Sequence, residues 1–269
     1  MKTIAQWLAQ AHQDIPANIR RQILSHVLNK NSAWLFGHDD VQLNEHQINQ
    51  LNQYLEQHRA GKPLAYIIGQ QPFWDLTLKV NEHTLIPRPD TELIIETVQS
   101  LSIEPDYILD LGTGSGALAL VLARLFTKSQ VMATDISVEA LRMASSNAQQ
   151  YQIKNITFQQ SRWFDDVRDH NFDLIVSNPP YIEAEDPHLK DLSHEPLNAL
   201  VSGQDGLNDL KIIIEQARNH LSNHGLLMVE HGYNQQQAVT DIFSRNGYSN
   251  IQTLVDIEQR PRATMGYQG

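Results

Sequence analysis

The sequence predicts a doubly wound α/β fold with a mostly parallel, seven-stranded sheet, preceded by a small helical domain. Three observations predict it. Short apolar runs alternate with helical periodicity from residue 105 onward, the first 60 residues show helical spacing only, and short polar motifs directly follow several of the apolar runs. Ligands of such sheets bind beyond the carboxyl ends of the strands, so those motifs are the candidate functional residues.

The N-terminal part reads as a bundle of helices. Ile4, Trp7 and Leu8 share one helical face, and the same spacing continues through Ile19, Ile23, Val27, Leu43, Ile48, Leu51 and Leu55. Residues 61–64 break this pattern, and the alternating residues 72–86 predict a β-hairpin or extended connector. We therefore expect a helical domain at 1–75, a hairpin and helical connector at 76–104, and the α/β domain at 105–269.

Predicted strands and helices alternate along the α/β domain. Apolar runs predict strands at 107–111, 131–134, 156–158, 172–176 and 225–230, with a terminal antiparallel pair at 251–257 and 263–267. Helices are predicted at 116–126, from Ser137 to about residue 150, at 208–221 and at 235–246. Repeated strand–helix units imply right-handed crossovers and a parallel sheet core.

Charge and composition exclude several classes of protein. The chain of 269 residues carries 20 Lys and Arg, 31 Asp and Glu, and a net charge of −11, and the whole excess lies in residues 76–269. Such acidity is a poor match for a nucleic acid and favours a protein or small-molecule substrate, although it also serves solubility. The absence of cysteine excludes thiol chemistry and fits the cytoplasm, and no apolar run approaches the ~20 residues of a membrane span.

The first motif is a glycine-rich loop that directly follows the strand at 107–111. It contains Asp110, Gly112, Thr113, Gly114, Ser115 and Gly116. Closely spaced glycines let the backbone turn tightly and approach a ligand. The spacing G-x-G-x-G departs from the dinucleotide pattern G-x-G-x-x-G, and the preceding acid suits a ligand with a cationic amino group better than a pyrophosphate. A plain tight turn is the alternative.

The second candidate, Asp135, ends the next predicted strand. A carboxylate at that position can accept two hydrogen bonds from a ribose diol. The alternative is a helix cap, although Ser137 already suits that task.

The third motif, Asn178-Pro179-Pro180-Tyr181, follows the fourth predicted strand. The two prolines cannot continue the strand and make its exit stiff. The Asn178 side chain and a proline carbonyl are then two aligned acceptors, which suit the two hydrogens of an NH₂ group. Gripping both hydrogens favours the attacking geometry of a planar nitrogen, and Tyr181 would add a flat wall. A rigid turn is the alternative.

Together these residues resemble the S-adenosylmethionine-dependent methyltransferases that act on planar nitrogen. The resemblance sharpens with residues 85–92, 110–116, 177–181, 195–200 and 230–232, which are similar to those of the HemK-type release factor glutamine methyltransferases. It covers residues 60–269, and a helical N-terminal domain of this size, expected to recognise the substrate, is also typical of that family.

The resemblance implies methyl transfer from S-adenosylmethionine, giving S-adenosyl-L-homocysteine, to the glutamine amide nitrogen in the Gly-Gly-Gln motif of class-one peptide chain release factors. Gly112, Gly114 and Gly116 would line the methionine part and Asp135 the ribose. Asn178 and Pro179 would hold the amide. Trp163 matches a family tryptophan near adenosine, but Arg162 stands where the family often has an acid. The other expected contacts are Asn178, Asp110, Thr113 and Ser115 for the cofactor and Pro180 and Tyr181 for the substrate, and the resemblance makes Asn178, Pro179 and Tyr181 the catalytic residues.

The same motifs leave several alternative functions open. An amino methyltransferase of DNA adenine or of ribosomal RNA guanine also fits the third motif, but the chain lacks a basic region for nucleic acid. A regulatory module with an inactive pocket is a further alternative. His188, His194 and His231 lack metal-ligand spacing, so we expect no metal. Residues 88–92 suit a site role or a helix start capped by Asp90 or Thr91. We expect a monomer without direct contact to nucleic acid or membrane.

Overall fold

The computed structural model describes residues 2–10, 13–168 and 171–269. Contacts divide the chain into two compact units, Met1–Gln70 and Gln71–Gly269. Among the described residues, no helix has the length and apolar character needed to cross a bilayer.

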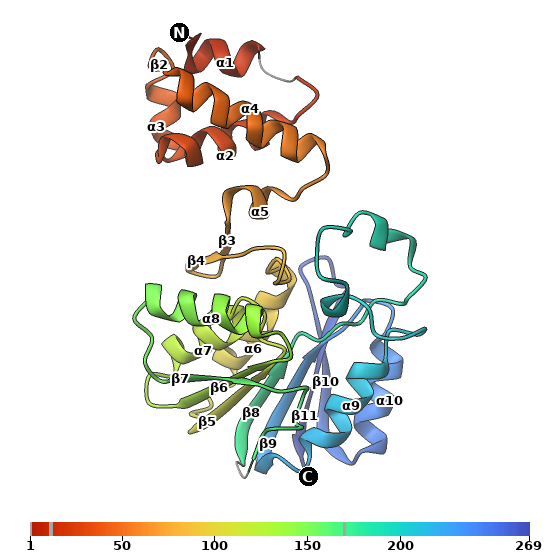
Figure 1. The fold of residues 1–269 in the computed structure, drawn as a ribbon. Coiled ribbons are helices and arrows are strands. Elements are labelled where there is room, and N and C mark those ends of the chain that lie inside the picture. Colours follow the sequence, from red (N-terminus) through yellow and green to blue (C-terminus); the bar gives the residue numbers. More distant parts are fainter. Residues whose placement is uncertain (1, 11–12, 169–170) are drawn as a thin grey trace. The chain divides into compact units, whose positions relative to one another are not determined.

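The first unit is helical, as predicted (Figure 1). Its helices are α1 (Ile4–Gln10), α2 (Ala17–Leu28), α3 (Ser32–Gly37), α4 (Glu45–Arg59) and α5 (Leu64–Ile68), and the short strands β1 (Lys2–Thr3) and β2 (Gln42–Leu43) pair antiparallel. Helix α4 begins after Asn44, whose side chain accepts a hydrogen bond from Gln47 N at 2.8 Å in a capping box. Leu43 therefore lies in β2, and the prediction that it continues the helix is wrong.

The second unit begins with a hairpin and a short helix. Strands β3 (Gln70–Phe73) and β4 (Leu76–Lys79) pair with each other, near the segment for which alternation predicts a hairpin. A 3₁₀ turn, η1 (Pro89–Thr91), then leads into α6 (Glu92–Ser100). These elements precede the main sheet along the chain.

The main sheet has the seven strands that the sequence predicts, in the order β10-β11-β9-β8-β5-β6-β7. They are β5 (Tyr107–Leu111), β6 (Gln130–Asp135), β7 (Ile156–Gln160), β8 (Phe172–Ser177), β9 (Leu221–Glu230), β10 (Tyr248–Val255) and β11 (Pro261–Gln268). Strands β5 to β9 run parallel, and β11 is antiparallel to both neighbours. The chain passes from β5 outward to β6 and β7 and then returns to β8, so the order reverses between β5 and β8.

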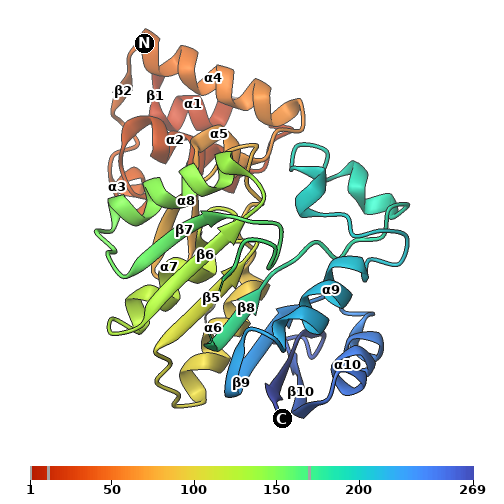
Figure 2. The same cartoon turned by 60° about the horizontal axis from the view of Figure 1, so that its bottom comes forward.

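Helices cover both faces of this sheet, which confirms the doubly wound fold (Figures 1 and 2). Helices α6, α7 (Ala117–Leu125) and α8 (Val138–Gln150) share one apolar core with the sheet. Helices α9 (Asn208–Ala217) and α10 (Gln236–Arg245) share the core of the other face. Helix α9 ends four residues before its predicted end, because Leu221 already pairs with Phe172 of β8.

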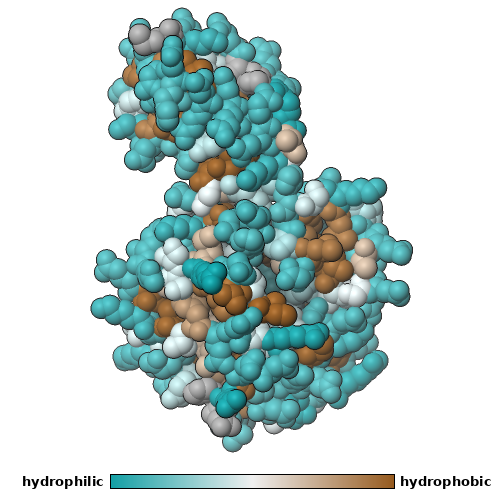
Figure 3. Space-filling model, in the orientation of Figure 1, coloured by the Kyte–Doolittle hydropathy of each residue, from teal (hydrophilic) through white to brown (hydrophobic). Residues whose placement is uncertain are grey.

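A long segment between β8 and α9, residues 182–206, contains the 3₁₀ turns η2 (Pro187–Lys190) and η3 (Leu197–Ala199). Its two ends are joined by a bridge between Ile182 and Val201. Figure 3 shows hydrophobic side chains gathered over this segment, where Leu197 is 64% exposed.

Candidate functional site

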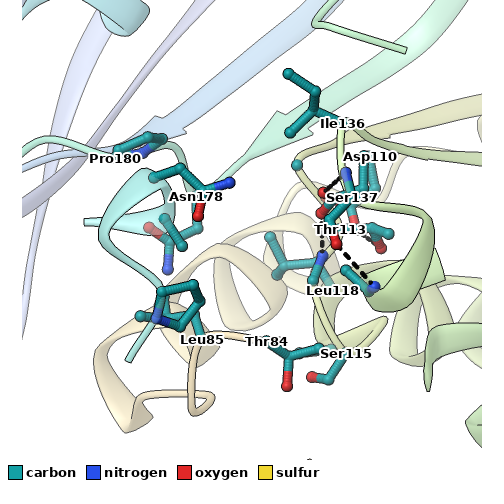
Figure 4. Close-up of a pocket in the computed structure, with 18 of the residues that line it drawn as sticks. Thr84, Leu85, Asp110, Thr113, Ser115, Leu118, Ile136, Ser137, Asn178 and Pro180 are labelled. Carbon is teal, nitrogen blue, oxygen red and sulfur yellow. Dashed lines mark hydrogen bonds between the residues drawn. The ribbon is translucent and has the colours of Figure 1, made fainter. Parts of the chain in front are cut away.

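A cavity lies beyond the carboxyl ends of β5, β6 and β8, at the point where the strand order reverses. Figure 4 shows Asn178 and Pro180 on one wall and Asp110, Thr113 and Ser137 on the opposite wall. The predicted site residues that line it are Asp110, Gly112, Thr113, Gly114, Ser115, Asp135, Trp163, Asn178 and Pro180. Three motifs that are distant in the sequence therefore border one space.

The three glycines of the loop after β5 have different tasks. All have positive φ, which disfavours other residues. A Cβ on Gly114 would meet no atom within 4 Å, so the cavity reaches this backbone, whereas a Cβ on Gly112 would lie 3.3 Å from the Trp163 ring. Gly116 is not among the lining residues, and a Cβ there would lie 2.9 Å from the side chain of Leu120. Gly116 thus permits helix packing.

Asp110 holds the glycine-rich loop through hydrogen bonds to its buried carboxyl group. It is 2% exposed, and its Oδ2 accepts hydrogen bonds from Thr113 Oγ1 at 2.7 Å and from Ala119 N at 3.2 Å. Burial raises the pKa of Asp110 to about 7. The carboxyl group therefore joins the loop to the first turn of α7.

Asp135 connects the end of β6 to the same loop. Its Oδ2 accepts from Gly114 N and its Oδ1 accepts from Ser137 N, both at 2.9 Å. The cap of α8 is Ser137, whose Oγ accepts from Ala140 N at 3.1 Å. Burial raises the pKa of Asp135. Asp135 also lines the cavity, so its carboxylate borders the space open to a ligand.

Trp163 has a partner that no motif predicts. Its Nε1 donates to Asp209 Oδ1 at 3.0 Å, and Ser202 Oγ donates to Asp209 Oδ2 at 2.6 Å. Both Arg162 and Asp209 line the cavity. An acid is thus present beside Trp163, but it comes from α9 rather than from the position before the tryptophan. The sequence alone does not reveal this role of Asp209, because an acid in the first turn of a helix is already explained by its favourable interaction with the helix dipole.

The residues around the Asn-Pro-Pro-Tyr motif form a buried hydrogen-bond network. Asn178 Nδ2 donates to Thr91 Oγ1 at 3.0 Å, Thr91 Oγ1 donates to Glu230 Oε2 at 2.6 Å, and Tyr181 OH donates to Glu230 Oε1 at 3.1 Å. Pro179 and Tyr181 are not among the lining residues. Burial and the nearby Glu230 carboxylate raise the pKa of Tyr181.

The network corrects one prediction. The sequence predicts Asp90 or Thr91 as the cap of the following helix. Thr91 occupies the cap position of α6, but its side chain makes no cap hydrogen bond and bonds instead to Glu230 and Asn178. Asp90 pairs with Arg262 at 3.2 Å instead. Glu230 lies in the segment 230–232 that carries the family resemblance, but the sequence assigns it no role; its place at the carboxyl end of a strand beside β8 is a usable signal.

The segment of residues 182–206 forms a further wall. Its six acids predict a loop that flanks the site, either as a solvated loop or as an acidic rim for a basic partner. Pro196, Asn198 and Ala199 line the cavity. Glu195 is buried, forms an ion pair with Arg88, and accepts from Ile86 N at 3.0 Å. Its carboxylate ties this segment to the residues before η1. Glu195 therefore does not belong to an exposed acidic rim.

Comparison with known proteins settles the family. A model described as "Methyltransferase domain" matches residues 105–261, and one described as "PrmC N-terminal domain" matches residues 1–69. The release factor glutamine methyltransferase of Escherichia coli is 41% identical, with 97% of each chain covered. That of Haemophilus influenzae is 38% identical, over 97% of this chain and 98% of its own. The chain belongs to the release factor glutamine methyltransferase family.

Solved structures agree with the methyltransferase fold of this family member. A methyltransferase from Pyrococcus furiosus superposes with a TM-score of 0.55 at 17% identity, covering 82% of this chain and 98% of its own. A 16S rRNA methyltransferase of T. thermophilus, solved with AdoMet and guanosine, gives 0.54 at 17% identity, over 74% and 50% of the two chains. The described part of the chain holds no group of three or more His, Cys, Asp or Glu placed for a metal ion.

Proposed function

We propose that this chain transfers a methyl group from S-adenosylmethionine to the side-chain amide nitrogen of glutamine in the Gly-Gly-Gln motif of class-one peptide chain release factors. The names of its relatives support this substrate. The observation that carries the chemistry is that Asn178 borders the same cavity as the glycine loop and Asp135. An amide acceptor is thereby placed beside a site suited to a nucleoside.

The residues that line the cavity suit the polar groups of S-adenosylmethionine. The open space at Gly114 leaves room for a ligand against the backbone, and Asp135 brings carboxylate acceptors to the cavity for a ribose diol. Trp163, whose indole nitrogen is held by Asp209, offers an aromatic surface at the side expected to hold adenosine. The bound group supplies an electrophilic methyl carried on a sulfonium; S-adenosyl-L-homocysteine remains as product.

The protein's own task is to orient the amide nitrogen. Asn178 Oδ1 and the Pro179 carbonyl are the proposed acceptors for its two N–H groups, with Pro180 and Tyr181 keeping the exit of β8 stiff. Holding both N–H groups in place favours a pyramidal nitrogen whose lone pair is withdrawn from conjugation with the carbonyl and directed at the methyl group, and this stabilisation is realised in the transition state. The nitrogen loses one proton to solvent after transfer, so no general base is assigned.

The remaining parts of the proposal concern the partner. We infer that the helical unit, placed at residues 1–75 by the sequence, recognises the release factor, and that residues 76–104 connect it to the catalytic domain at 105–269. Release factors act in translation, so we place the enzyme in the cytoplasm, as a monomer that needs no nucleic acid.

The test is a transfer assay with labelled S-adenosylmethionine and three substrates: a class-one release factor, duplex DNA and ribosomal RNA. We expect label on the release factor alone. Label on DNA or RNA with none on the release factor would favour an amino methyltransferase of nucleic acid instead.

A further inference from the structure

Asn178 is the first of four polar side chains, from distant parts of the chain, that are joined in series; Asn178 and Thr91 both line the cavity. Asn178 donates to Thr91, and Thr91 and Tyr181 each donate to a different oxygen of Glu230. Thr91 is 3% exposed and Glu230 is 2% exposed. Buried polar groups of this kind are fully paired and therefore well ordered.

The direction of each hydrogen bond follows from Glu230. While Glu230 is ionised, its carboxylate can only accept hydrogen bonds, so both hydroxyl protons point toward it. The Thr91 proton is then used, and the Thr91 oxygen can only accept a hydrogen bond from Asn178. This requirement turns the Nδ2 side of the Asn178 amide toward Thr91. Among the described residues, none donates to Asn178 Oδ1, which is left for a ligand in the cavity.

We propose that Thr91 and Glu230 are positioning residues that hold the Asn178 amide with its oxygen available to the N–H of the substrate glutamine. The proposal rests on the proposed function. If the Thr91 hydroxyl could donate to Asn178 instead, the amide could flip. It would then present its own N–H donors to the substrate's N–H donors.

Charged side chains of both signs lie near Glu230. Asp90 and Arg262 act on it electrostatically, and Arg262 also pairs with Asp90 at 3.2 Å and with Asp256 at 2.8 Å. The neighbouring His231 turns away, with its Nε2 at 2.9 Å from Thr264 Oγ1. The two hydroxyl donors of the network are thus the direct partners of the carboxylate.

Substitution of Thr91 separates positioning from folding. Thr91→Val keeps the shape and removes the hydroxyl, so we expect kcat on the release factor to fall by about 10- to 100-fold. The Kd of S-adenosylmethionine should stay within about twofold, because the other cavity contacts remain. Thr91→Ser keeps the hydroxyl and should restore kcat to within about threefold of the wild type.

Substitution of Glu230 tests the direction of the bonds. Glu230→Gln is nearly isosteric, but its amide accepts from one hydroxyl and donates to the other. The Thr91 proton is then no longer required to point toward residue 230. We expect kcat to fall by about 10-fold or more with cofactor affinity retained. Matched controls are Thr97→Val, which loses a hydroxyl bonded within α6, and Glu92→Gln, which can still accept from Trp74 N.

Three outcomes test the positioning roles of Thr91 and Glu230 separately from the proposed function. A wild-type enzyme that does not methylate the release factor contradicts the proposed function. An active wild type with unchanged kcat in Thr91→Val and Glu230→Gln contradicts only the positioning roles. Parallel loss of cofactor affinity and thermal stability in both variants, without rescue by Thr91→Ser, also contradicts them. If Thr91→Val does not fold, Thr91→Ala provides the same comparison with Thr91→Ser.

Discussion

At the scale of single residues, the chemistry of the site depends on Asn178. Its Nδ2 donates to Thr91 Oγ1 at 3.0 Å, and the residue borders the cavity. An acceptor fixed before the substrate arrives can stabilise the transition state without reorganisation at the moment of reaction. Its contribution is therefore expected in kcat rather than in cofactor binding.

Replacing Asn178 with alanine removes this acceptor. We expect kcat for release factor methylation to fall by about 100- to 1000-fold, the usual effect of losing one pre-placed polar group. The Kd of S-adenosylmethionine, measured by calorimetry, should change by less than about threefold. A variant with near-normal turnover would refute the amide-gripping role.

The pH dependence of activity follows from Glu230. Burial raises the pKa of this carboxyl to about 7, with Asp90 raising it further and Thr91, Tyr181 and Arg262 lowering it. Below that pH the protonated carboxyl becomes a donor and releases the Thr91 hydroxyl. We expect wild-type kcat to decline as the pH falls through about 7. The decline should disappear in Glu230→Gln, and its persistence there would assign it to another group.

Stability should have the opposite pH dependence. The folded-state pKa of Glu230 lies above its unfolded value of 4.5, so the folded protein binds the extra proton between those two values. The free energy of unfolding should therefore decrease as the pH rises from about 4.5 to about 7, by on the order of 3 kcal/mol from this group. Urea titrations at several pH values test this, and Glu230→Gln should show a shallower slope. An equal slope in both proteins would contradict the assignment.

At the scale of elements, the glycine loop shows how much local sequence can predict. The strand, the turn and the helix after it follow from an apolar run and positive-φ glycines, and the structure contains all three. Element ends are less predictable, because they depend on distant partners. Helix α9 stops early because Leu221 pairs with β8. The Thr91 side chain makes no cap hydrogen bond to α6 and bonds to Glu230 instead.

Two glycine variants should separate the tasks within this loop. Gly116→Ala adds positive-φ strain and a methyl 2.9 Å from Leu120, so we expect a loss of about 2–4 kcal/mol in the free energy of unfolding. Gly114→Ala has the strain but open space, so we expect a loss of only about 1–2 kcal/mol, together with weaker S-adenosylmethionine binding. Denaturant titration and calorimetry distinguish them. Equal losses of stability would show that packing at Gly116 is unimportant.

At the scale of the whole molecule, the sheet topology assembles what the chain keeps apart. Thr91 and Glu230 are 139 residues apart. Both lie in segments that carry the family resemblance, but no spacing in the sequence predicts that their side chains meet. The three motifs were predictable because each follows a strand, and parallel strands bring their carboxyl ends to one edge. The supporting residues were not, because their partners are set by tertiary packing.

The net charge also acts at this scale. Glu183, Glu185 and Asp191 are exposed in the segment that walls the cavity, and the release factor is expected to present basic surface there. Reversing two charges, with Glu183→Lys and Glu185→Lys, should weaken release factor binding several-fold and reduce its salt dependence. Glu104→Lys with Asp106→Lys, near the opposite end of β5, is the matched control. Equal affinity in both double variants would leave solubility as the purpose of these acids.

The most direct test of the central claim is mass spectrometry of release factor peptides after incubation with the enzyme and S-adenosylmethionine. We predict one added methyl group on the glutamine of the Gly-Gly-Gln peptide, and none when that glutamine is replaced by glutamate or when the enzyme carries Asn178→Ala. A methyl group on another residue, or an unmodified Gly-Gly-Gln peptide beside an active enzyme, would contradict the account.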